Sequence, residues 1–337
     1  MSNCLLQDCI NDLVDPKRGI LAADESSPTI AKRFAGISVE STEQSRRQYR
    51  TALLSTPNLG DYISGVILFE ETLSQADDNG VAIAQLAWNQ KIVPGIKVDK
   101  GLGPLPGAPG DKITYGLDGL TERLEHYKSL GARFAKWREV YVIGHHNPTR
   151  LGLTANAEML ARYAALCQSS GIVPIVEPEV LMDGDHDIER CAAVTEAVLK
   201  TVFYALDQHR VSLEHMLLKP NMVLPGKDCS SGCSAEQIAT TTLKILRRAV
   251  PAAVPSINFL SGGMGPEEAT LNLNAINQYN EQAPWQLSIS YGRALQQPAL
   301  QAWQGKSENT ENTQQALLKR AKLNSLARQG KYSPNME

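Results

Sequence analysis

Short apolar runs alternate along the chain with longer stretches that mix apolar and charged residues. Eight runs are rich in Ile, Val, Leu, Ala and Phe and recur roughly 30 to 45 residues apart; they cover residues 18–24, 62–71, 91–99, 132–140, 171–180, 215–223, 256–263 and 287–293. Continuous apolar character over such short lengths predicts strands that are covered on both faces.

The stretches between these runs have the composition of helices. They are rich in Ala, Leu, Glu and Arg and often end in Gly, as in residues 42–55, 117–131, 156–171 and 189–210. Alternation of strand and helix implies parallel pairing, and eight such units are the number that closes a barrel. We therefore predict an α/β fold, a (β/α)8 TIM barrel, with an open doubly wound sheet as the alternative.

The pattern predicts one domain. The length of 337 residues suits a single barrel with insertions, and no linker divides the chain. The Pro/Gly-rich segment 101–110 is predicted to be a loop; it does not suit a phosphate cradle, because its prolines lack backbone donors and no helix opens at its last glycine. We expect one barrel domain over residues 1–337, with an N-terminal helix and a short C-terminal extension.

Composition and charge narrow the classes of function. The chain is 42% hydrophobic and 20% charged, which is typical of soluble globular proteins. Its 33 basic and 36 acidic residues include no long basic block, which argues against a nucleic-acid or membrane surface. The six cysteines are too sparse for a disulfide framework, and Asp8 and Asp12 interrupt the N-terminal segment where a signal peptide would be apolar. No apolar run reaches the length of a membrane span, so we expect a cytoplasmic protein.

Charged residues lie inside or directly after the apolar runs, where burial is costly unless they are paired or face a polar cavity. Residues two apart on a strand share a face, and the C-terminal strand ends of a barrel build its active site. The charged strand positions are Asp24, Glu70, Lys97, Asp99, Lys136, Arg138, Glu177, Glu179 and Lys219. They predict an active site at the barrel mouth; a structural ion-pair network that caps the barrel is the alternative.

Lys219 is the candidate nucleophile. It ends the apolar run HMLL, so it is partly desolvated, and a neighbouring cation such as Lys136 would lower its pKa further. A neutral amine of this kind attacks ketones. Taken alone, a strand-end lysine also suits a snorkelling or ion-paired role.

The last two runs predict a phosphate site. FLSGGMG and SYGRAL bring glycines and Arg293 to the loops after the seventh and eighth strands, which is the customary phosphate site of this barrel. Plain turn chemistry is the alternative for Gly262 and Gly263. Cations for a second phosphate are offered by Lys97, Arg33 and Arg138. A sugar bisphosphate therefore fits as the ligand.

Metal signals in the sequence are weak. His145 and His146 are adjacent and would point to opposite faces of a strand, and DGDHD at 183–187 lacks the spacing of a calcium loop. CSSGC at 229–233 has no second cysteine pair to complete a site. We predict surface loops at all three places and no metal.

Eight segments together resemble one family: LAADES, GIKVDKG, FAKWR, IVPIVEPE, LLKPNMV, FLSGG, NLNAIN and SYGRAL. On these motifs the chain is identified as a member of the class I fructose-bisphosphate aldolases, in order from about residue 5 to Tyr332. The resemblance implies a cofactor-free enzyme that reversibly cleaves fructose 1,6-bisphosphate to dihydroxyacetone phosphate and glyceraldehyde 3-phosphate through a lysine Schiff base. It also implies a place in glycolysis, gluconeogenesis or the Calvin cycle, sedoheptulose 1,7-bisphosphate as a second substrate, and a homotetramer.

Carried over motif by motif, the resemblance implies a role for each site residue. Lys219 would be the Schiff-base lysine and Glu177 the proton-transferring carboxylate, with Asp24, Lys136 and Glu179 as their partners. One phosphate would be bound by Ser261, Gly262, Gly263, Ser290, Gly292 and Arg293. Lys97, Arg33 and Ser26 would lie toward the other phosphate, with Arg138 near the same mouth.

Two features depart from the family pattern. Ser27, Pro28 and Thr29 occupy a loop where relatives usually carry a second hydroxyl. The sequence also stops at Glu337, whereas many relatives continue with a mobile tail whose terminal tyrosine assists proton exchange at C3 of the enamine. We expect protonation of the enamine to limit turnover, and Glu337 to be unordered.

Two other functions remain open. A transaldolase-like Schiff-base barrel would act on other phosphosugars, but two phosphate sites argue against it. A scaffold could hold an acidic partner at the basic mouth, but the intact set of Lys219, Glu177 and Lys136 favours catalysis.

Overall fold

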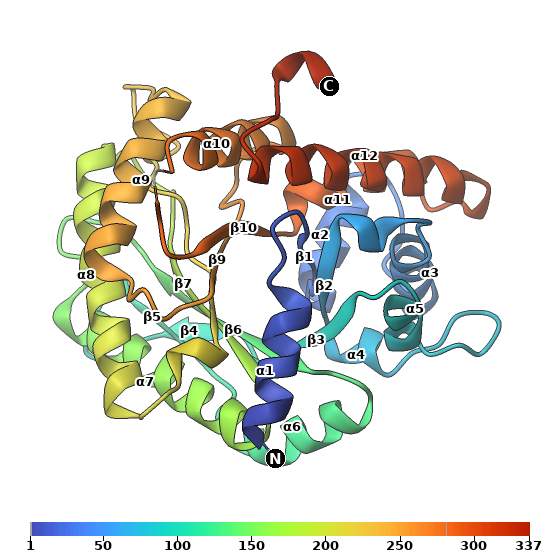
Figure 1. The fold of residues 1–337 in the computed structure, drawn as a ribbon, viewed down its shortest axis with the longest axis horizontal. Helices are drawn as coiled ribbons and strands as arrows, with labels where there is room; N and C mark the ends of the chain where they lie inside the picture. Colours follow the sequence, from blue (N-terminus) through green and yellow to red (C-terminus); the bar gives the residue numbers. More distant parts are fainter. Residues whose placement is uncertain (1, 281) are drawn as a thin grey trace.

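The computed structural model describes residues 2–280 and 282–337 and has a closed barrel of parallel strands at its centre (Figure 1). The order around the barrel is β1-β10-β9-β8-β7-β6-β3-β2. The strands are β1 (Gly19–Ala23), β2 (Ile63–Leu68), β3 (Val93–Lys97), β6 (Phe134–Tyr141), β7 (Val173–Val180), β8 (Leu217–Leu218), β9 (Ser256–Phe259) and β10 (Gln286–Tyr291). Each overlaps one predicted run, so the barrel is confirmed and the open-sheet alternative is wrong.

Helices follow the strands and surround the barrel. They are α2 (Ser27–Ala35), α3 (Glu43–Leu54), α4 (Glu70–Leu73), α5 (Ile83–Asn89), α6 (Leu120–Ser129), α7 (Arg150–Ser169), α8 (Ile188–Gln208), α9 (Ala235–Ala249), α10 (Pro266–Gln278), α11 (Arg293–Trp303) and α12 (Thr310–Arg328). Two of the longest helices, α7 and α8, begin with a side-chain cap: Thr149 and Asp187 each accept a hydrogen bond from the backbone N–H three residues later. The helices predicted from composition are confirmed as α3, α6, α7 and α8.

Helix α1 (Ser2–Leu13) closes one end of the barrel and passes in front of the ring of strands in Figure 1. Leu6, Cys9, Ile10 and Leu13 share one face of this helix through their spacing of three and four. That face joins a buried cluster with the strand residues Ile20, Ala22, Ile67, Val93, Phe134, Val173, Ile175 and Leu217. Apolar contacts therefore seal the N-terminal end of the strands, opposite the end where charged residues were predicted to gather.

The segment 101–110 was predicted to be a plain loop, and that prediction is wrong in part. β4 (Leu102–Pro104) pairs antiparallel with β5 (Lys112–Thr114) in a two-stranded hairpin outside the barrel. Thr114 ties the hairpin to β6: its N–H donates to Glu139 at 3.2 Å and its hydroxyl donates to the carbonyl of Arg138 at 2.8 Å. Strands of three residues are too short to carry a readable alternation of apolar and polar positions.

The C-terminal segment packs onto the barrel's outer helices. α12 lies along α11 and α10 (Figure 1), and the carboxylate of Glu337 lies 2.5 Å from Nη1 of Arg320. The hydroxyl of Tyr332 donates to the same carboxylate at 2.9 Å. The expectation of an unordered Glu337 is wrong, because the guanidinium of Arg320 is buried and requires a counter-charge.

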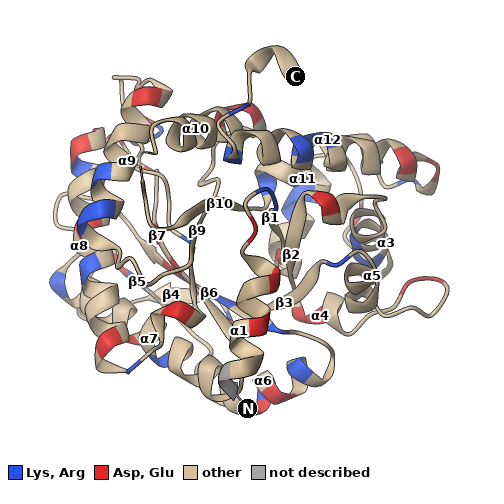
Figure 2. Cartoon of the chain, viewed as in Figure 1, with Lys and Arg blue, Asp and Glu red and all other residues tan. Residues whose placement is uncertain are grey.

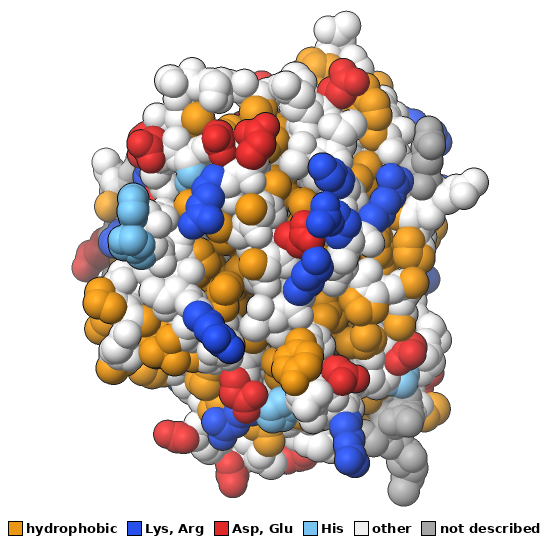
Figure 3. Space-filling model, turned by 90° about the vertical axis from the view of Figure 1, so that its left-hand side faces the viewer, with side chains coloured by type: hydrophobic (Ala, Val, Ile, Leu, Met, Phe, Trp, Pro, Cys, Tyr) orange, Lys and Arg blue, Asp and Glu red, His pale blue; other side chains and the backbone are white. Residues whose placement is uncertain are grey.

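Charges of both signs alternate over the outer helices (Figure 2). On the side that carries α8 and α9 they are interspersed with apolar side chains (Figure 3), and Glu196 there pairs with both Lys200 and Arg248. All six cysteines are free. Within residues 2–280 and 282–337, none of the helices has the length and apolar character that crossing a membrane requires.

Candidate active site

A cavity of about 490 Å³ opens at the C-terminal ends of the barrel strands. All of the catalytic and phosphate-binding residues predicted from the sequence line it: Asp24, Ser26, Arg33, Lys97, Lys136, Arg138, Glu177, Glu179, Lys219, Ser261, Gly262, Gly263, Ser290, Gly292 and Arg293. They come from segments spread over most of the chain, and the barrel brings them together because parallel strands end on the same side.

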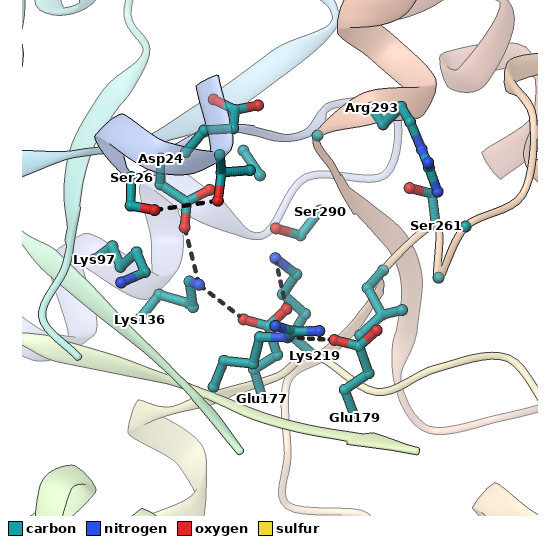
Figure 4. A pocket seen from close by; sticks show the side chains of 18 of the residues that line it. Asp24, Ser26, Lys97, Lys136, Glu177, Glu179, Lys219, Ser261, Ser290 and Arg293 are labelled. Carbon is teal, nitrogen blue, oxygen red and sulfur yellow. Dashed lines mark hydrogen bonds and ion pairs between the residues drawn. The ribbon is translucent and has the colours of Figure 1, made fainter. Parts of the chain in front are cut away.

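Glu177 lies between two lysines in this cavity (Figure 4). Its Oε1 is 3.1 Å from Nζ of Lys219, and its Oε2 is 3.1 Å from Nζ of Lys136. Asp24 Oδ2 lies 2.9 Å from the same Lys136 Nζ, which makes a chain of alternating charges. The backbone N–H of Lys219 donates to the carbonyl of Val176 at 2.8 Å, so the pairing of the chain beyond β8 with β7 places Lys219 beside Glu177.

The neighbouring charges of this ion-pair network stabilise the ionised forms of Asp24 and Lys136. Burial alone would raise the pKa of Asp24, but Lys136 and Lys219 outweigh it and hold that pKa well below its usual range. Burial would lower the pKa of Lys136, but Asp24, Glu177 and Asp99 together raise it well above its usual range. At neutral pH, Asp24 is therefore a carboxylate and Lys136 an ammonium.

Two ion pairs extend the charged set toward the mouth. Lys97 Nζ lies 2.6 Å from Oδ1 of Asp99, and Nε of Arg138 donates to Oε2 of Glu179. Lys97 and Arg138 keep part of their side chains exposed. Both cations can therefore meet an anionic ligand without losing their carboxylate partners.

The loops after β9 and β10 form the opposite side of the cavity, where Figure 4 shows Ser261, Ser290 and Arg293. Gly262 and Gly263 have φ of 54° and 103°, in the left-handed region that favours glycine. A Cβ on Gly263 would lie 3.3 Å from Nη2 of Arg293, so glycine also leaves the guanidinium its space. Among the described residues, the buried Oγ of Ser290 has no hydrogen-bond partner, and α11 begins at Arg293, with the N-terminal end of its dipole at the cavity. This arrangement suits a phosphate group.

Five further residues line the cavity and were not among the predicted site residues: Ala22, Glu25, Thr29, Lys32 and Leu260. Thr29 Oγ1 lies 3.1 Å from Oγ of Ser26, so Thr29 supplies a second hydroxyl in the loop that departs from the family pattern. The placement of Thr29 three residues after Ser26, at the start of a helix, was a signal that could have indicated this contact. Glu25 carried no such signal, because its partners Arg33 and Arg50 lie on two different helices.

Several charged or metal-like positions lie outside the cavity lining. Glu70 pairs with Lys100 and accepts from the hydroxyl of Tyr127, so the structural ion-pair interpretation holds for this strand end. His145 and His146 lie in an exposed loop with ring centroids 4.2 Å apart. The expectation that they point to opposite faces of a strand is therefore wrong, while the prediction of a surface loop is confirmed.

Comparison with known proteins decides the family. The family described as "Fructose-bisphosphate aldolase class-I" matches residues 5–337. The chain belongs to this family. The aldolase is 55% identical to "Fructose-bisphosphate aldolase 4, cytosolic" of Arabidopsis thaliana, over 94% of this chain and 81% of that protein. It is 53% identical to "Fructose-bisphosphate aldolase C" of Homo sapiens, over 98% of this chain and 92% of that protein.

Solved structures agree with the fold of this aldolase. It matches fructose-bisphosphate aldolase from Plasmodium falciparum, solved in complex with TRAP and a small-molecule inhibitor, with a TM-score of 0.97 and 50% identity. The match covers 98% of this chain and 96% of that chain. As a class I member, the aldolase cleaves fructose 1,6-bisphosphate reversibly to dihydroxyacetone phosphate and glyceraldehyde 3-phosphate through a lysine Schiff base, and it requires no metal ion.

Proposed function

We propose that Lys219 is the Schiff-base lysine of this aldolase and that Glu177 is the carboxylate that moves protons around it. The observation that carries the proposal is the position of Glu177, 3.1 Å from the amine of Lys219 and 3.1 Å from the ammonium of Lys136. At this distance Glu177 can take a proton directly from Lys219, which leaves the neutral amine that attacks a ketone.

The proposed reaction begins when Nζ of Lys219 attacks C2 of the ketose and forms a carbinolamine. Glu177, which took a proton from Lys219 before the attack, gives that proton to the departing C2 oxygen, which leaves as water and produces the iminium ion. The cluster of Glu177, Asp24 and Lys136 then takes the proton of the C4 hydroxyl. The C3–C4 bond breaks, its electron pair enters the iminium system, and glyceraldehyde 3-phosphate leaves. Protonation of the resulting enamine at C3 and hydrolysis release dihydroxyacetone phosphate and restore Lys219.

Substrate binding in this proposal uses both sides of the cavity. The loops of Ser261, Gly262 and Gly263 and of Ser290, Gly292 and Arg293 hold one phosphate. Lys97, Arg33 and Ser26 lie toward the other, and Arg138 and Glu179 complete the mouth. The buried Oγ of Ser290, which has no hydrogen-bond partner within the described part of the chain, supports this assignment, because a phosphate oxygen would satisfy it.

Borohydride reduction in the presence of dihydroxyacetone phosphate tests the proposal. The imine would be reduced to a stable secondary amine, and peptide mapping should locate the added mass on Lys219. Lys219→Ala should abolish turnover and the adduct while the thermal unfolding midpoint stays close to that of the parent chain, because barrel stability rests on the apolar layers and helices. An adduct on another lysine would remove Lys219 from its proposed role.

We also propose that residues 1–337 form a single domain that assembles into a homotetramer in the cytoplasm. One continuous set of buried side chains surrounding the barrel supports the single domain. The six free cysteines and the cytosolic designation of the Arabidopsis relative support the location. Sedoheptulose 1,7-bisphosphate is proposed as a second substrate, since it presents the same C2 to C4 unit and two terminal phosphates to the cations of the cavity.

A further inference from the structure

Glu25 is a carboxylate in the cavity wall whose side chain is only 4% exposed. It lies between Asp24, which pairs with Lys136, and Ser26, which precedes α2. An ionised carboxylate that has lost most of its water needs cationic or hydrogen-bonding partners. The role of Glu25 is therefore set by the residues that neutralise its charge.

Three helices supply the partners of Glu25. Nη2 of Arg50 on α3 lies 2.6 Å from Oε2, Nη1 of Arg33 on α2 donates to Oε1, and Nε2 of Gln296 on α11 donates to Oε1 at 2.8 Å. The same Nε2 donates to the carbonyl of Ala22 in β1 at 2.6 Å. Glu25 is therefore held from two sides by groups fixed in the core and in the barrel.

The two arginines differ in what they can reach. The side chain of Arg50 is 3% exposed, so it serves as an internal counter-charge, whereas that of Arg33 is 25% exposed and lines the cavity. Nη2 of Arg33 lies 3.9 Å from the position that a Cβ on Gly292 would take, so the guanidinium extends from the side assigned to the second phosphate toward the loop assigned to the first. A flexible arginine is held in this place by one buried carboxylate that Arg50 and Gln296 anchor.

We propose that Glu25 is a positioning residue for substrate binding: it holds the guanidinium of Arg33 where a substrate phosphate binds. This inference rests on the proposed function, which assigns Arg33 to a phosphate. Glu25 does not touch substrate itself. It fixes the orientation of the Arg33 guanidinium before the substrate binds, so that binding does not have to order that side chain.

Steady-state kinetics on a double-mutant cycle tests the inference. Glu25→Gln keeps the shape of the side chain and removes its charge, Arg33→Ala removes the group that it positions, and the third variant carries both. With fructose 1,6-bisphosphate we expect Glu25→Gln to raise KM about tenfold and to change kcat less than about twofold. In the Arg33→Ala background the same change should add no further rise in KM, since Glu25 acts through Arg33.

A matched control separates positioning from general support of α3. Arg46 lies on α3, as Arg50 does, and donates two hydrogen bonds of 2.6 and 2.7 Å to Glu71, which lies outside the cavity lining. Glu71→Gln should leave KM unchanged while lowering the unfolding midpoint. An equal rise in KM for Glu71→Gln, or equal effects of Glu25→Gln with and without Arg33, overturns the inference.

A second variant covers the case in which Glu25→Gln does not fold. Glu25→Asp keeps a carboxylate that can pair with Arg50, but the side chain is one methylene shorter and no longer reaches Arg33, so KM should rise in the same way. An unchanged KM in the folded Glu25 variants, with a raised KM in Arg33→Ala, overturns the positioning role alone. An unchanged KM in Arg33→Ala instead removes Arg33 from the phosphate site, so the proposed function of that residue and this inference both fail.

Discussion

Glu177 and Lys219 stand 3.1 Å apart on neighbouring members of the barrel, β7 and the residue that follows β8. Both side chains are almost fully buried, and Lys136 approaches the same carboxylate from β6 at 3.1 Å. A carboxyl group that touches the nucleophile and a fixed cation can exchange protons with the substrate without moving. Its removal should therefore affect chemistry more than binding.

Glu177→Gln is expected to lower kcat by about 10² to 10⁴, because the amide keeps the shape and can still hydrogen-bond to Lys219 but transfers no proton. KM should change little, since no phosphate contact is lost. Steady-state kinetics and thermal unfolding measure both effects. The control is Glu196→Gln on α8, which removes a carboxylate paired with Lys200 and Arg248 on the outer surface and should leave kcat unchanged. A kcat within about threefold of the parent value for Glu177→Gln would contradict the assignment.

Arg293→Ala is expected to raise KM for fructose 1,6-bisphosphate sharply. A desolvated, charge-assisted contact between arginine and phosphate contributes on the order of 2 to 5 kcal/mol. Arg162→Ala, at an exposed position on α7, serves as the control and should change neither KM nor kcat. If KM of the Arg293 variant equals that of the control, Arg293 does not belong to the phosphate site.

We expect the free energy of unfolding to fall as pH rises toward 7, because Glu139 is buried. Its side chain is fully buried beside β5, where it accepts from Trp137 Nε1 at 2.8 Å and from the N–H of Thr114 at 3.2 Å, and burial raises its pKa to about 7. Between about 4.5 and 7 the folded chain holds a proton that the unfolded chain has released, so stability falls as pH rises through this window.

Glu139→Gln removes this dependence. The difference in unfolding free energy between the variant and the parent chain should shift in favour of the variant by about 2 kcal/mol from pH 5 to pH 8. Urea unfolding of both chains across this range measures the shift. A difference that stays constant with pH would mean that Glu139 is not protonated near neutrality in the folded chain.

Glu337→Gln is expected to destabilise the protein without changing kcat. Arg320 is buried and would lose its anionic partner, which costs about 1 to 3 kcal/mol. Burial would raise the pKa of Glu337, but Arg320 outweighs burial and lowers it. The stability that this pair contributes is therefore present above the ordinary glutamate pKa and is lost as pH falls below it. Equal unfolding midpoints of variant and parent at pH 7 would show that the ion pair contributes nothing.

The order of apolar and charged residues along the chain is enough to predict the barrel and the end of it that carries the site. Eight apolar runs separated by helical stretches dictate parallel strands, since only strands covered on both faces are apolar throughout. Charged residues two apart at the ends of those runs, such as Lys136 with Arg138 and Glu177 with Glu179, lie on the same face of their strand. Because the strands of a (β/α)8 barrel are parallel, all of these strand ends meet at one mouth of the barrel.

Which charged residues pair with each other depends on the folded arrangement of the whole chain. Glu177 pairs with Lys136 and Lys219, Glu25 with Arg50 and Gln296, and Glu337 with Arg320, and none of these pairs is adjacent on one strand or one helix. A pattern of apolar and polar residues specifies the face on which a side chain lies but carries no information about its partner. Partners are chosen by the register of the closed barrel and by the packing of helices around it, and both exist only once the whole chain has folded.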